Sequence, residues 1–414
     1  MSERTTEDTG RGKTMNELEK TLYHQVQEDH DYIVGLRRWF HQHPELAREE
    51  NMTAARIEQE LDAIGIPHRR VAVTGVYAEI EGTKPCKGER RCIVLRADID
   101  GLPVKQENGV PYESLCPGKM HACGHDAHNA SLIGAARILS QNRDLFSGKV
   151  IFTWQPGEEV GYGARPIIDE GNIDEADRSF GVHMASNVPV GSLVLMEGPN
   201  NASVDWFRIR VHGLGAHVSV PQRGVDAAYI ASQIVVSTQA LVTRRTSPMA
   251  NVLIGIGKIT AGTAYNVVAQ EAELEGTIRV FSPEIRRDTK ARLEFLAKQT
   301  AEMYGGTAEL EWNDNTSALI NDPAATAEAQ KTAFSLFGQD RVITRRQPDL
   351  GGDDFAEYII RVPGCYAYIG SGNPSNPNTQ VAHHNAYFDI DEDAMTVATA
   401  IYTCYTVEYL NRLV

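Results

Sequence analysis

The chain has 414 residues, of which 42% are hydrophobic and 23% are charged. This length exceeds one ordinary hydrophobic core, so we expect two domains. The formal net charge of −15 argues against nucleic-acid partners and against anionic membrane surfaces, since both would repel the protein. No apolar run reaches the roughly 20 residues that a membrane-spanning helix requires.

The N-terminal segment "MSERTTEDTGRGKTM" is polar and lacks the apolar stretch of a secretory signal. We therefore expect residues 1–15 to form a disordered leader and the protein to remain in the cytoplasm. The six cysteines have no disulfide-framework or CxxC spacing, which is typical of reduced thiols.

Strands and helices alternate in the first half of the chain. Apolar residues at helical spacing predict helices within 16–65 and over 126–142. Apolar, β-rich runs of strand length occur at 91–99, 149–156 and 178–184. This alternation predicts an α/β sandwich whose functional residues lie at strand ends.

The middle of the chain has a different order of elements, which is βαββαβ from about residue 202 to 314. This is the order of the split βαβ, ferredoxin-like arrangement. We expect an inserted domain over 202–314 and a first domain formed by 16–201 and 315–414, where α/β texture returns.

The segment "MHACGHDAHNA" concentrates candidate metal ligands at the start of a predicted helix. Cys123 and His125 carry a thiol and an imidazole, the usual ligands of zinc and similar transition metals. Alone, the pair is better explained as a buried small thiol and a satisfied histidine. We assign His121, Asp126 and His128 to supporting or helix-capping positions.

Further candidate ligands follow other predicted strands. Glu158 and Glu159 in "TWQPGEEVG" come directly after a strand, and in extended backbone their side chains would point to opposite sides. One carboxylate could then bind a metal while the other faces a water, although a solvated charge pair is the alternative. His183, the pair His383–His384, and the aspartates of "RADIDGLP" (Asp98 and Asp100) also follow or end strands. Their recurrence at strand ends favours one shared site.

This set of motifs resembles the metal-dependent aminoacylase/carboxypeptidase superfamily, in its amidohydrolase branch of hippurate hydrolases and indole-acetyl–amino-acid hydrolases. The resemblance covers the chain from "RRWFHQHPEL" to "AHHNAYFDID". Its markers occur in the family's order and include "RADIDGLP", "MHACGHDAH", "QPGEE", "GVHM", "GLGAHVSVP", "GGDDF" and "HHNAYF". It implies a zinc-exopeptidase-like catalytic α/β sandwich with an inserted ferredoxin-like dimerisation domain.

The resemblance also implies a site for two divalent metal ions. Manganese or zinc would be the metals, with cobalt or nickel as further possibilities. Glu158 would be the general base that takes a proton from the attacking water and delivers it to the leaving amine. Asp100 would orient a ligand. The implied ligands are Cys123, His125, Glu159, His183 and His384.

Three residues of the inserted domain match substrate-contacting positions of the family. His217 would reach the active site of a second subunit and hydrogen-bond the oxyanion, which predicts a homodimer. Asn266 and Arg279 would hold the free carboxylate of the substrate, a task that suits the guanidinium fork. For Arg279, a salt bridge on the sheet surface is the alternative.

Together these features predict hydrolysis of the amide bond in an N-acyl amino acid, giving a carboxylic acid and a free amino acid. The metal hydrolase follows from the residues, and the substrate follows from the resemblance. A dipeptidase or exopeptidase with the same machinery is the alternative within the enzymes. A non-catalytic small-molecule-binding relative is the alternative from another class.

Overall fold

The computed structural model describes residues 15–86 and 88–412, so the expected leader lies almost wholly outside the described residues. The described chain forms two compact units. The first runs to Gly198 and continues over Asn321–Gln347 and from Glu357 onward. The second comprises Pro199–Ile320 and Pro348–Ala356. The sequence assigns the short 348–356 segment to the first domain, whereas it packs with the second unit.

An eight-stranded mixed sheet forms the centre of the first unit, in the order β1-β2-β4-β3-β5-β14-β6-β13. β3, β4, β5 and β14 run parallel to their neighbours in this group. Every residue of β3 and β14 is buried, because strands of such a sheet are covered on both faces. The strands are β1 (His68–Val71), β2 (Gly75–Glu81), β3 (Cys92–Asp98), β4 (Lys149–Gln155), β5 (Arg178–Pro189), β6 (Leu193–Val194), β13 (Val342–Ile343) and β14 (Gly364–Gly372).

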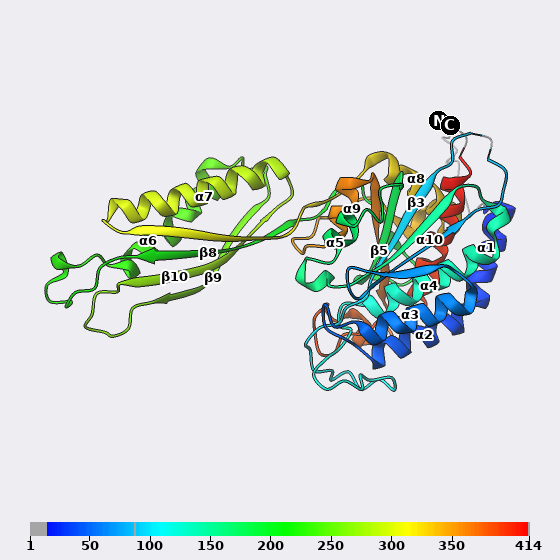
Figure 1. The fold of residues 1–414 in the computed structure, drawn as a ribbon, viewed down its shortest axis with the longest axis horizontal. Helices are drawn as coiled ribbons and strands as arrows, with labels where there is room; N and C mark the ends of the chain where they lie inside the picture. The colour runs from blue at the N-terminus through cyan, green and yellow to red at the C-terminus, as the bar shows by residue number, and fades with distance from the viewer. Residues whose placement is uncertain (1–14, 87, 413–414) are drawn as a thin grey trace, which may run out of the picture. The chain divides into compact units, whose positions relative to one another are not determined.

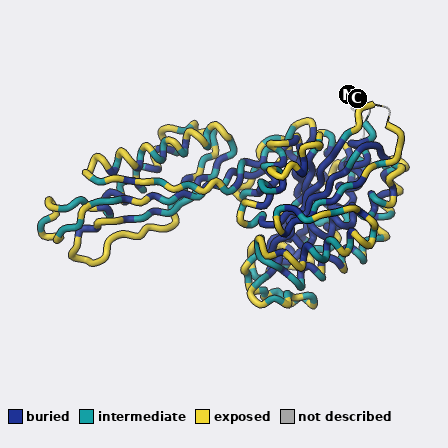
Figure 2. Tube along the Cα trace, viewed as in Figure 1, coloured by how far each residue is buried: buried dark blue, intermediate teal, exposed yellow. Residues whose placement is uncertain are grey.

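Helices cover this sheet, and two of them are buried along most of their length. These are α4 (His125–Gln141) and α10 (Ala394–Leu410), which pack against each other and form part of the dark core in Figure 2. Gly134 permits this close packing, because a Cβ there would lie 3.3 Å from the side chain of Thr399 on α10 and 2.7 Å from that of Ile33 on the helix His30–Gln42. The other helices of this unit are α1 (Glu17–Glu28), α2 (His30–Gln42), α3 (Asn51–Ile64), α5 (Ala164–Asp169) and α8 (Pro323–Phe337). The helix α9 (Phe355–Arg361) begins in the second unit and continues into the first at Glu357.

The second unit has the βαββαβ order that the sequence predicts. Its four-stranded antiparallel sheet has the order β11-β8-β10-β9, which is the ferredoxin-like arrangement. Both helices lie on one face of the sheet (Figure 1). The elements are β8 (Ser203–His212), α6 (Ala227–Ala240), β9 (Val252–Ala261), β10 (Glu271–Val280), α7 (Pro283–Met303) and β11 (Thr307–Thr316).

Local sequence explains where the helices of the second unit begin. Asp226 caps α6 by accepting hydrogen bonds from the backbone N–H groups of Ala228 and Tyr229. Ser282 caps α7, and Pro283 occupies the first helical position, where its missing N–H costs nothing. Along β8 the odd-numbered residues are buried under the helices and the even-numbered residues lie on the opposite face.

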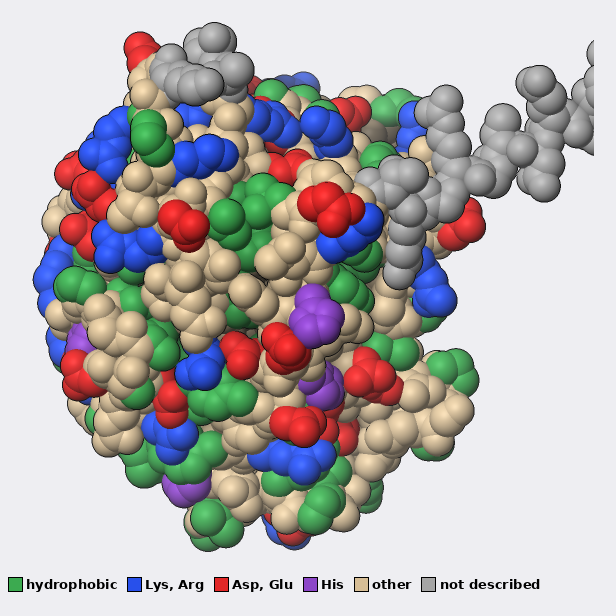
Figure 3. Space-filling view, turned by 90° about the vertical axis from the view of Figure 1, so that its right-hand side faces the viewer, with side chains coloured by type: hydrophobic (Ala, Val, Ile, Leu, Met, Phe, Trp, Pro, Cys, Tyr) green, Lys and Arg blue, Asp and Glu red, His purple; other side chains and the backbone are tan. Residues whose placement is uncertain are grey.

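A short two-stranded sheet of β7 (Gly198–Asn201) and β12 (Leu319–Asn321) completes the described strands. Among the described residues, no helix combines the length and the apolar character needed to cross a membrane. On the face of the molecule in Figure 3, acidic and basic side chains are interspersed.

Candidate metal centre

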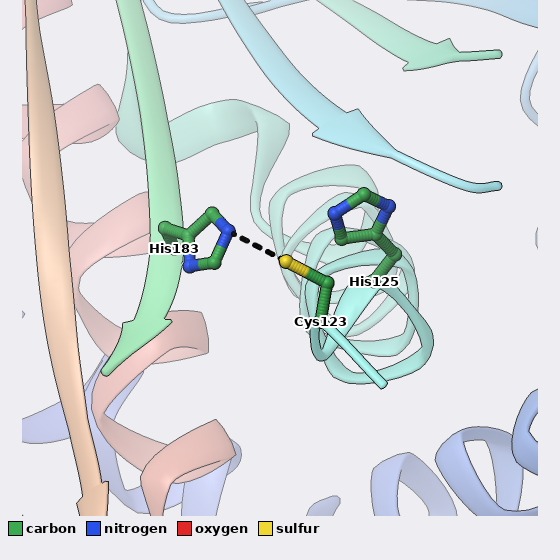
Figure 4. Close-up of side chains that lie close together, drawn as sticks. All are labelled: Cys123, His125 and His183. Carbon is green, nitrogen blue, oxygen red and sulfur yellow. Dashed lines mark hydrogen bonds between the residues drawn. The ribbon is translucent and has the colours of Figure 1, made fainter. Parts of the chain in front are cut away.

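Cys123 and His125 flank Gly124, the residue that immediately precedes α4. Gly124 has the left-handed backbone angles φ 94° and ψ 11°, and a Cβ there would lie 3.2 Å from the Cβ of Met184. A glycine is therefore needed both for the turn and for the close approach of β5. Figure 4 shows the result, with Cys123 facing His183 of β5. Cys123 Sγ lies 3.5 Å from His183 Nε2, and His125 is fully buried beside them.

His183 lies inside a strand, so the prediction that it ends one is wrong. β5 continues to Pro189, but its pairing with β3 stops at Gly181 opposite Arg96. Beyond Gly181, β5 remains paired with β14, whereas its pairing with β3 has ended. His183 is thus placed where the paired part of β3 has ended, next to the start of α4. Its Nδ1 is bonded to the carbonyl of Met184 at 2.6 Å, which leaves Nε2 toward Cys123.

Glu158 and Glu159 also differ from the expectation, since they do not lie in extended backbone. Gly157, at φ 64°, turns the chain after β4 into a one-turn 3₁₀ helix, Glu158–Val160. An oxygen of each carboxylate and a ring nitrogen of His125 lie within 4.8 Å of one another. The two carboxylates therefore gather at one place instead of pointing to opposite sides.

Asp100 supports this turn and a neighbouring histidine at once. Its carboxylate accepts the backbone N–H groups of Glu158 at 3.1 Å and Glu159 at 3.0 Å. Its Oδ1 also lies 3.2 Å from His125 Nδ1. Asp100, which is itself buried, thus fixes the orientation of the His125 ring. The other ring nitrogen of His125, Nε2, then faces Glu159.

His384 approaches from the segment after β14. Its Nε2 lies 3.3 Å from Glu159 Oε2, and its side chain is 54% exposed. Its backbone φ of 64° is unusual for a residue other than glycine. The segment is held because the N–H of His384 donates to Ala122 O at 2.8 Å and His383 Nδ1 lies 3.2 Å from Cys123 O.

The residues implied as ligands lie together. Three overlapping groups each have ligand atoms within 4.8 Å of one another: Cys123 with His125 and His183, Cys123 with Glu159 and His384, and His125 with Glu158 and Glu159. His125 Nε2 and Glu159 Oε1 are buried, have no hydrogen-bond partner within the described part of the chain, and lie 3.8 Å apart. Buried polar atoms normally have partners. A thiol, imidazoles and carboxylates with such unpartnered atoms fit a pair of divalent cations.

Burial and neighbouring charges shift the pKa values of these groups. Burial, reinforced by Glu159, raises the pKa of the Cys123 thiol well above its usual range. Burial lowers the pKa of His183 to about 4. Burial opposes the charge of His125, but Asp98 and the contact with Asp100 raise its pKa well above the usual value. The cluster thus combines a neutral His183 imidazole with carboxylates that attract positive charge.

Asp98 organises a second buried network beneath the site. It accepts a hydrogen bond from Arg96 Nη1 at 2.6 Å, and its Oδ1 lies 2.6 Å from His128 Nδ1. His128 Nε2 in turn accepts the backbone N–H of Met184 at 2.8 Å, next to His183. The supporting position assigned to His128 is consistent with these contacts, but sequence reasoning missed Arg96.

Sequence reasoning also missed Arg37 and His41, which both contact Asp126. The Arg37 guanidinium is fully buried and donates to Asp126, Asp389 and Glu392 at 2.8, 2.7 and 3.2 Å. His41 Nδ1 lies 2.8 Å from Asp126 Oδ2. The signal in the sequence was an arginine and a histidine four residues apart on the buried stripe of α2.

His217 and Asn266 lie in neighbouring segments of the second unit. His217 forms an antiparallel bridge with Val267, and the N–H of Val218 donates to Asn266 O at 3.1 Å. The N–H of Ser219 donates to His217 Nδ1 at 3.0 Å, and both His217 and Asn266 are exposed. These contacts leave His217 Nε2 without a hydrogen-bond partner among the described residues.

Arg279 lies on the same sheet, on β10. Its Nε donates to Thr277 Oγ1 at 3.1 Å and its Nη1 donates to Leu350 O at 3.2 Å. No carboxylate in the described chain pairs with it, whereas Arg208 and Arg286 pair with acidic neighbours. This argues against the salt bridge on the sheet surface, because both hydrogen bonds given for Arg279 go to neutral oxygens and no acidic partner occurs among the described residues.

Comparison with known proteins decides the family. The pattern of Peptidase family M20/M25/M40 matches residues 94–408. This chain belongs to that family. It is 38% identical to an N-acetyl-L-cysteine deacetylase of Bacillus subtilis (strain 168), over 89% of this chain and 85% of the relative. It is 31% identical to IAA-amino acid hydrolase ILR1-like 4 of Arabidopsis thaliana, over 92% of this chain and 87% of the relative.

A solved structure of this family is also similar over nearly the whole chain. It is a Bacillus subtilis protein described as a dinuclear metal-binding peptidase, with a TM-score of 0.81 and 32% identity, covering 94% of this chain and 99% of that one. The resemblance inferred from the motifs is confirmed, and so is the fold class. The M20-family chain is a hydrolase that acts on amide bonds and has a metal-binding peptidase fold.

Proposed function

We propose that this M20-family hydrolase cleaves N-acyl amino acids into a carboxylic acid and a free amino acid. The observation that carries the proposal is the unpartnered pair of buried atoms, His125 Nε2 and Glu159 Oε1, within the cluster that also holds Cys123, His183 and His384. These five side chains would hold two divalent cations. Bound cations would polarise the scissile carbonyl and lower the pKa of water.

Side chains of the protein transfer the proton and bind the substrate. Glu158 takes a proton from the attacking water and delivers it to the leaving amine. Asp100 keeps Glu158 in place through its backbone N–H. Arg279, which has no carboxylate partner among the described residues, holds the substrate's carboxylate together with Asn266.

His217 supplies the remaining contact. Its free Nε2 donates a hydrogen bond to the oxyanion in the active site of a second subunit. A homodimer formed through the ferredoxin-like unit follows from this role. The exposed backbone of the edge strand β9 supports the proposal, because edge strands are a natural place for two copies to pair. The six cysteines, all free thiols, support a reducing compartment such as the cytoplasm.

The experiment is a hydrolysis screen read by amine release, with manganese or zinc present or removed by a chelator. N-acetyl, N-benzoyl and indole-acetyl amino acids are compared with dipeptides. We expect turnover of N-acyl amino acids that depends on metal, and a loss of about 10³-fold or more for Glu158→Gln. Turnover of dipeptides alone would favour the exopeptidase alternative. Full turnover by Glu158→Gln would refute the mechanism.

A further inference from the structure

A hollow lies on the face of the ferredoxin-like sheet that α6 and α7 do not cover. It has a volume of about 410 Å³ and is lined by Trp206, Gly255, Gly257, Thr277 and the pair Lys258–Glu275. We call it the Trp206 hollow. Register explains its composition, because Trp206 and Gly255 both pair with Thr277, one from each side of β10.

The two glycines of β9 create the hollow, and packing does not require them. A Cβ on Gly255 would meet only Thr277 Cγ2, at 3.8 Å, and a Cβ on Gly257 would meet nothing within 4 Å. By contrast, a Cβ on Gly276 would collide with the Phe207 ring at 2.4 Å. A glycine inside a strand often marks a bulge or the close approach of a ligand. Gly257 is the extra residue of β9 at the register shift opposite Glu275 and Gly276, whereas Gly255 is regularly paired with Thr277 and has no such structural reason.

The hollow adjoins the guanidinium to which we assign the substrate's carboxylate. Arg279 Nε donates to Thr277 Oγ1, and Thr277 lines the hollow. Residues two apart on a strand share a face and lie about 7 Å apart. In an amino acid, the side chain branches one atom from the carboxylate. A substrate held by Arg279 can therefore direct that side chain over Gly255 and against Trp206.

The charges at the rim of the hollow are already neutralised. Lys258 Nζ lies 2.6 Å from Glu275 Oε1, and Arg208 Nη2 lies 3.7 Å from Glu275 Oε2. The Arg208 guanidinium also lies 4.9 Å from the centre of the Trp206 ring. Among the described residues that line the hollow, no acidic or basic group is left unpaired to select a charged side chain, whereas an indole ring and bare backbone favour an apolar one. The volume of about 410 Å³ lies within the range of ligand pockets and is large enough for one aromatic side chain.

We propose that the Trp206 hollow receives an apolar or aromatic side chain of the amino acid that the enzyme releases. This inference rests on the proposed function, since it takes Arg279 as the group that holds the carboxylate. It adds the substrate class, which is N-acyl derivatives of large apolar amino acids such as phenylalanine.

The kinetic test compares N-acetyl-L-phenylalanine with N-acetylglycine. We expect the wild-type kcat/KM to be at least about tenfold higher for the phenylalanine substrate. Gly255→Leu fills the hollow and should lower kcat/KM for that substrate about tenfold, while N-acetylglycine changes less than about twofold. Ile259→Ala, on the same strand outside the hollow, should leave the ratio unchanged. Trp206→Ala replaces Gly255→Leu if circular dichroism shows that the latter is unfolded.

A binding test separates this inference from the proposed reaction. In the Glu158→Gln enzyme with metal present, N-acetyl-L-phenylalanine should quench tryptophan fluorescence, and N-acetylglycine should not. The quenching should vanish when Trp206→Phe is added, because Trp39 and Trp154 belong to the first unit and Trp312, on β11, does not line the hollow.

The outcomes are distinguishable. If both substrates are hydrolysed equally well by wild type and by Gly255→Leu, the hollow has no role and the proposed function stands. If neither substrate is hydrolysed but quenching by the phenylalanine derivative depends on Trp206, the hollow stands and the proposed function fails. If neither turnover nor quenching occurs, both are refuted.

Discussion

His125 uses one ring nitrogen for Asp100 and leaves the other facing Glu159, so its partners determine what it can bind. The same division recurs at His183, whose Nδ1 is bonded to a backbone carbonyl while Nε2 faces Cys123. Side chains that are fixed by one hydrogen bond and free at the other nitrogen suit metal binding. The buried hydrogen-bond partners of the two histidines therefore decide, together with the residue type, which ring nitrogen can bind a metal.

Arg37 should matter for the stability of the centre although it is not a candidate ligand. Arg37→Met removes a fully buried cation and leaves Asp126 and Asp389 without that partner. We expect a loss of about 3–5 kcal/mol in the free energy of unfolding, measured by urea unfolding. Arg38→Met is the matched control, because Arg38 is 47% exposed and pairs with Glu392 at the surface. It should cost less than about 1 kcal/mol. Equal effects of the two variants would contradict this view of the network.

His121 should make stability depend on pH. It is buried, neither ring nitrogen has a hydrogen-bond partner in the described ranges 15–86 and 88–412, and burial lowers its pKa to about 4. Because its pKa in the unfolded chain is near 6.5, the unfolded state binds the proton first as pH falls. Its stabilisation is thus complete above pH 6.5 and is lost as pH falls toward 4.

The measurement is the free energy of unfolding of metal-free protein across this window. Between its two pKa values, a buried neutral histidine such as His121 changes the free energy of unfolding by about 1.4 kcal/mol per pH unit. The His121→Leu variant should lose this contribution to the slope. An unchanged slope in the variant would show that His121 is not buried in its neutral form.

Among the elements, the turn at Gly157 connects β4 to the two glutamates. Gly157→Ala places a Cβ in ordinary contact with Val160 at 3.7 Å and Gly163 at 3.9 Å, so the change acts through the backbone angle of 64°. We expect a cost of about 1–2 kcal/mol and at least tenfold lower kcat/KM, because the carboxylates shift with the turn.

Gly65→Ala controls for the backbone penalty. Gly65 ends α3 at φ 71° with open space around it, and it lies far in sequence from every candidate ligand. It should lose similar stability and keep full activity. Equal losses of activity in the two variants would contradict the role given to the Gly157 turn.

The sequence predicted the long elements well because their periodicity extends over many residues. The helix α4 and the strands β3 and β4 follow the expected ranges closely, and β8, α6 and α7 occur in the expected order. Short strands such as β6 and β13 were missed, since two residues carry no periodic signal. The position of His183 and the geometry of the glutamate pair were wrong because both depend on tertiary neighbours: the end of β3 pairing in one case and the left-handed Gly157 in the other.

The ligand residues could be proposed from the sequence through ordered motifs, but the groups that hold them could not. Arg37 and Asp389 are 352 positions apart and meet only in the folded chain. That pairing arises from the packing of α2 with the segment after β14. Arg96, by contrast, pairs with Asp98 two residues on along β3, where alternate side chains share a face, so this pair was within reach of the sequence and was overlooked.

At the scale of the whole molecule, the proposed dimer makes two inactive variants complementary. If His217 acts in the partner's active site, Glu158→Gln and His217→Ala subunits together form one intact site per mixed dimer. Random exchange should restore about a quarter of wild-type activity, because half of the dimers are mixed and half of their sites are intact. Activity that stays at the level of the separate variants, although mixed dimers form, would rule out the trans role.

The most direct test of the central claim is a titration of metal-free protein with zinc or manganese, read together by bound ions per chain and by amine release from an N-acyl amino acid. We predict that about two ions bind per chain and that activity appears with them. Glu159→Ala and Cys123→Ala should bind fewer ions while remaining folded. Full activity without bound metal, or ion binding that neither substitution weakens, would contradict the account.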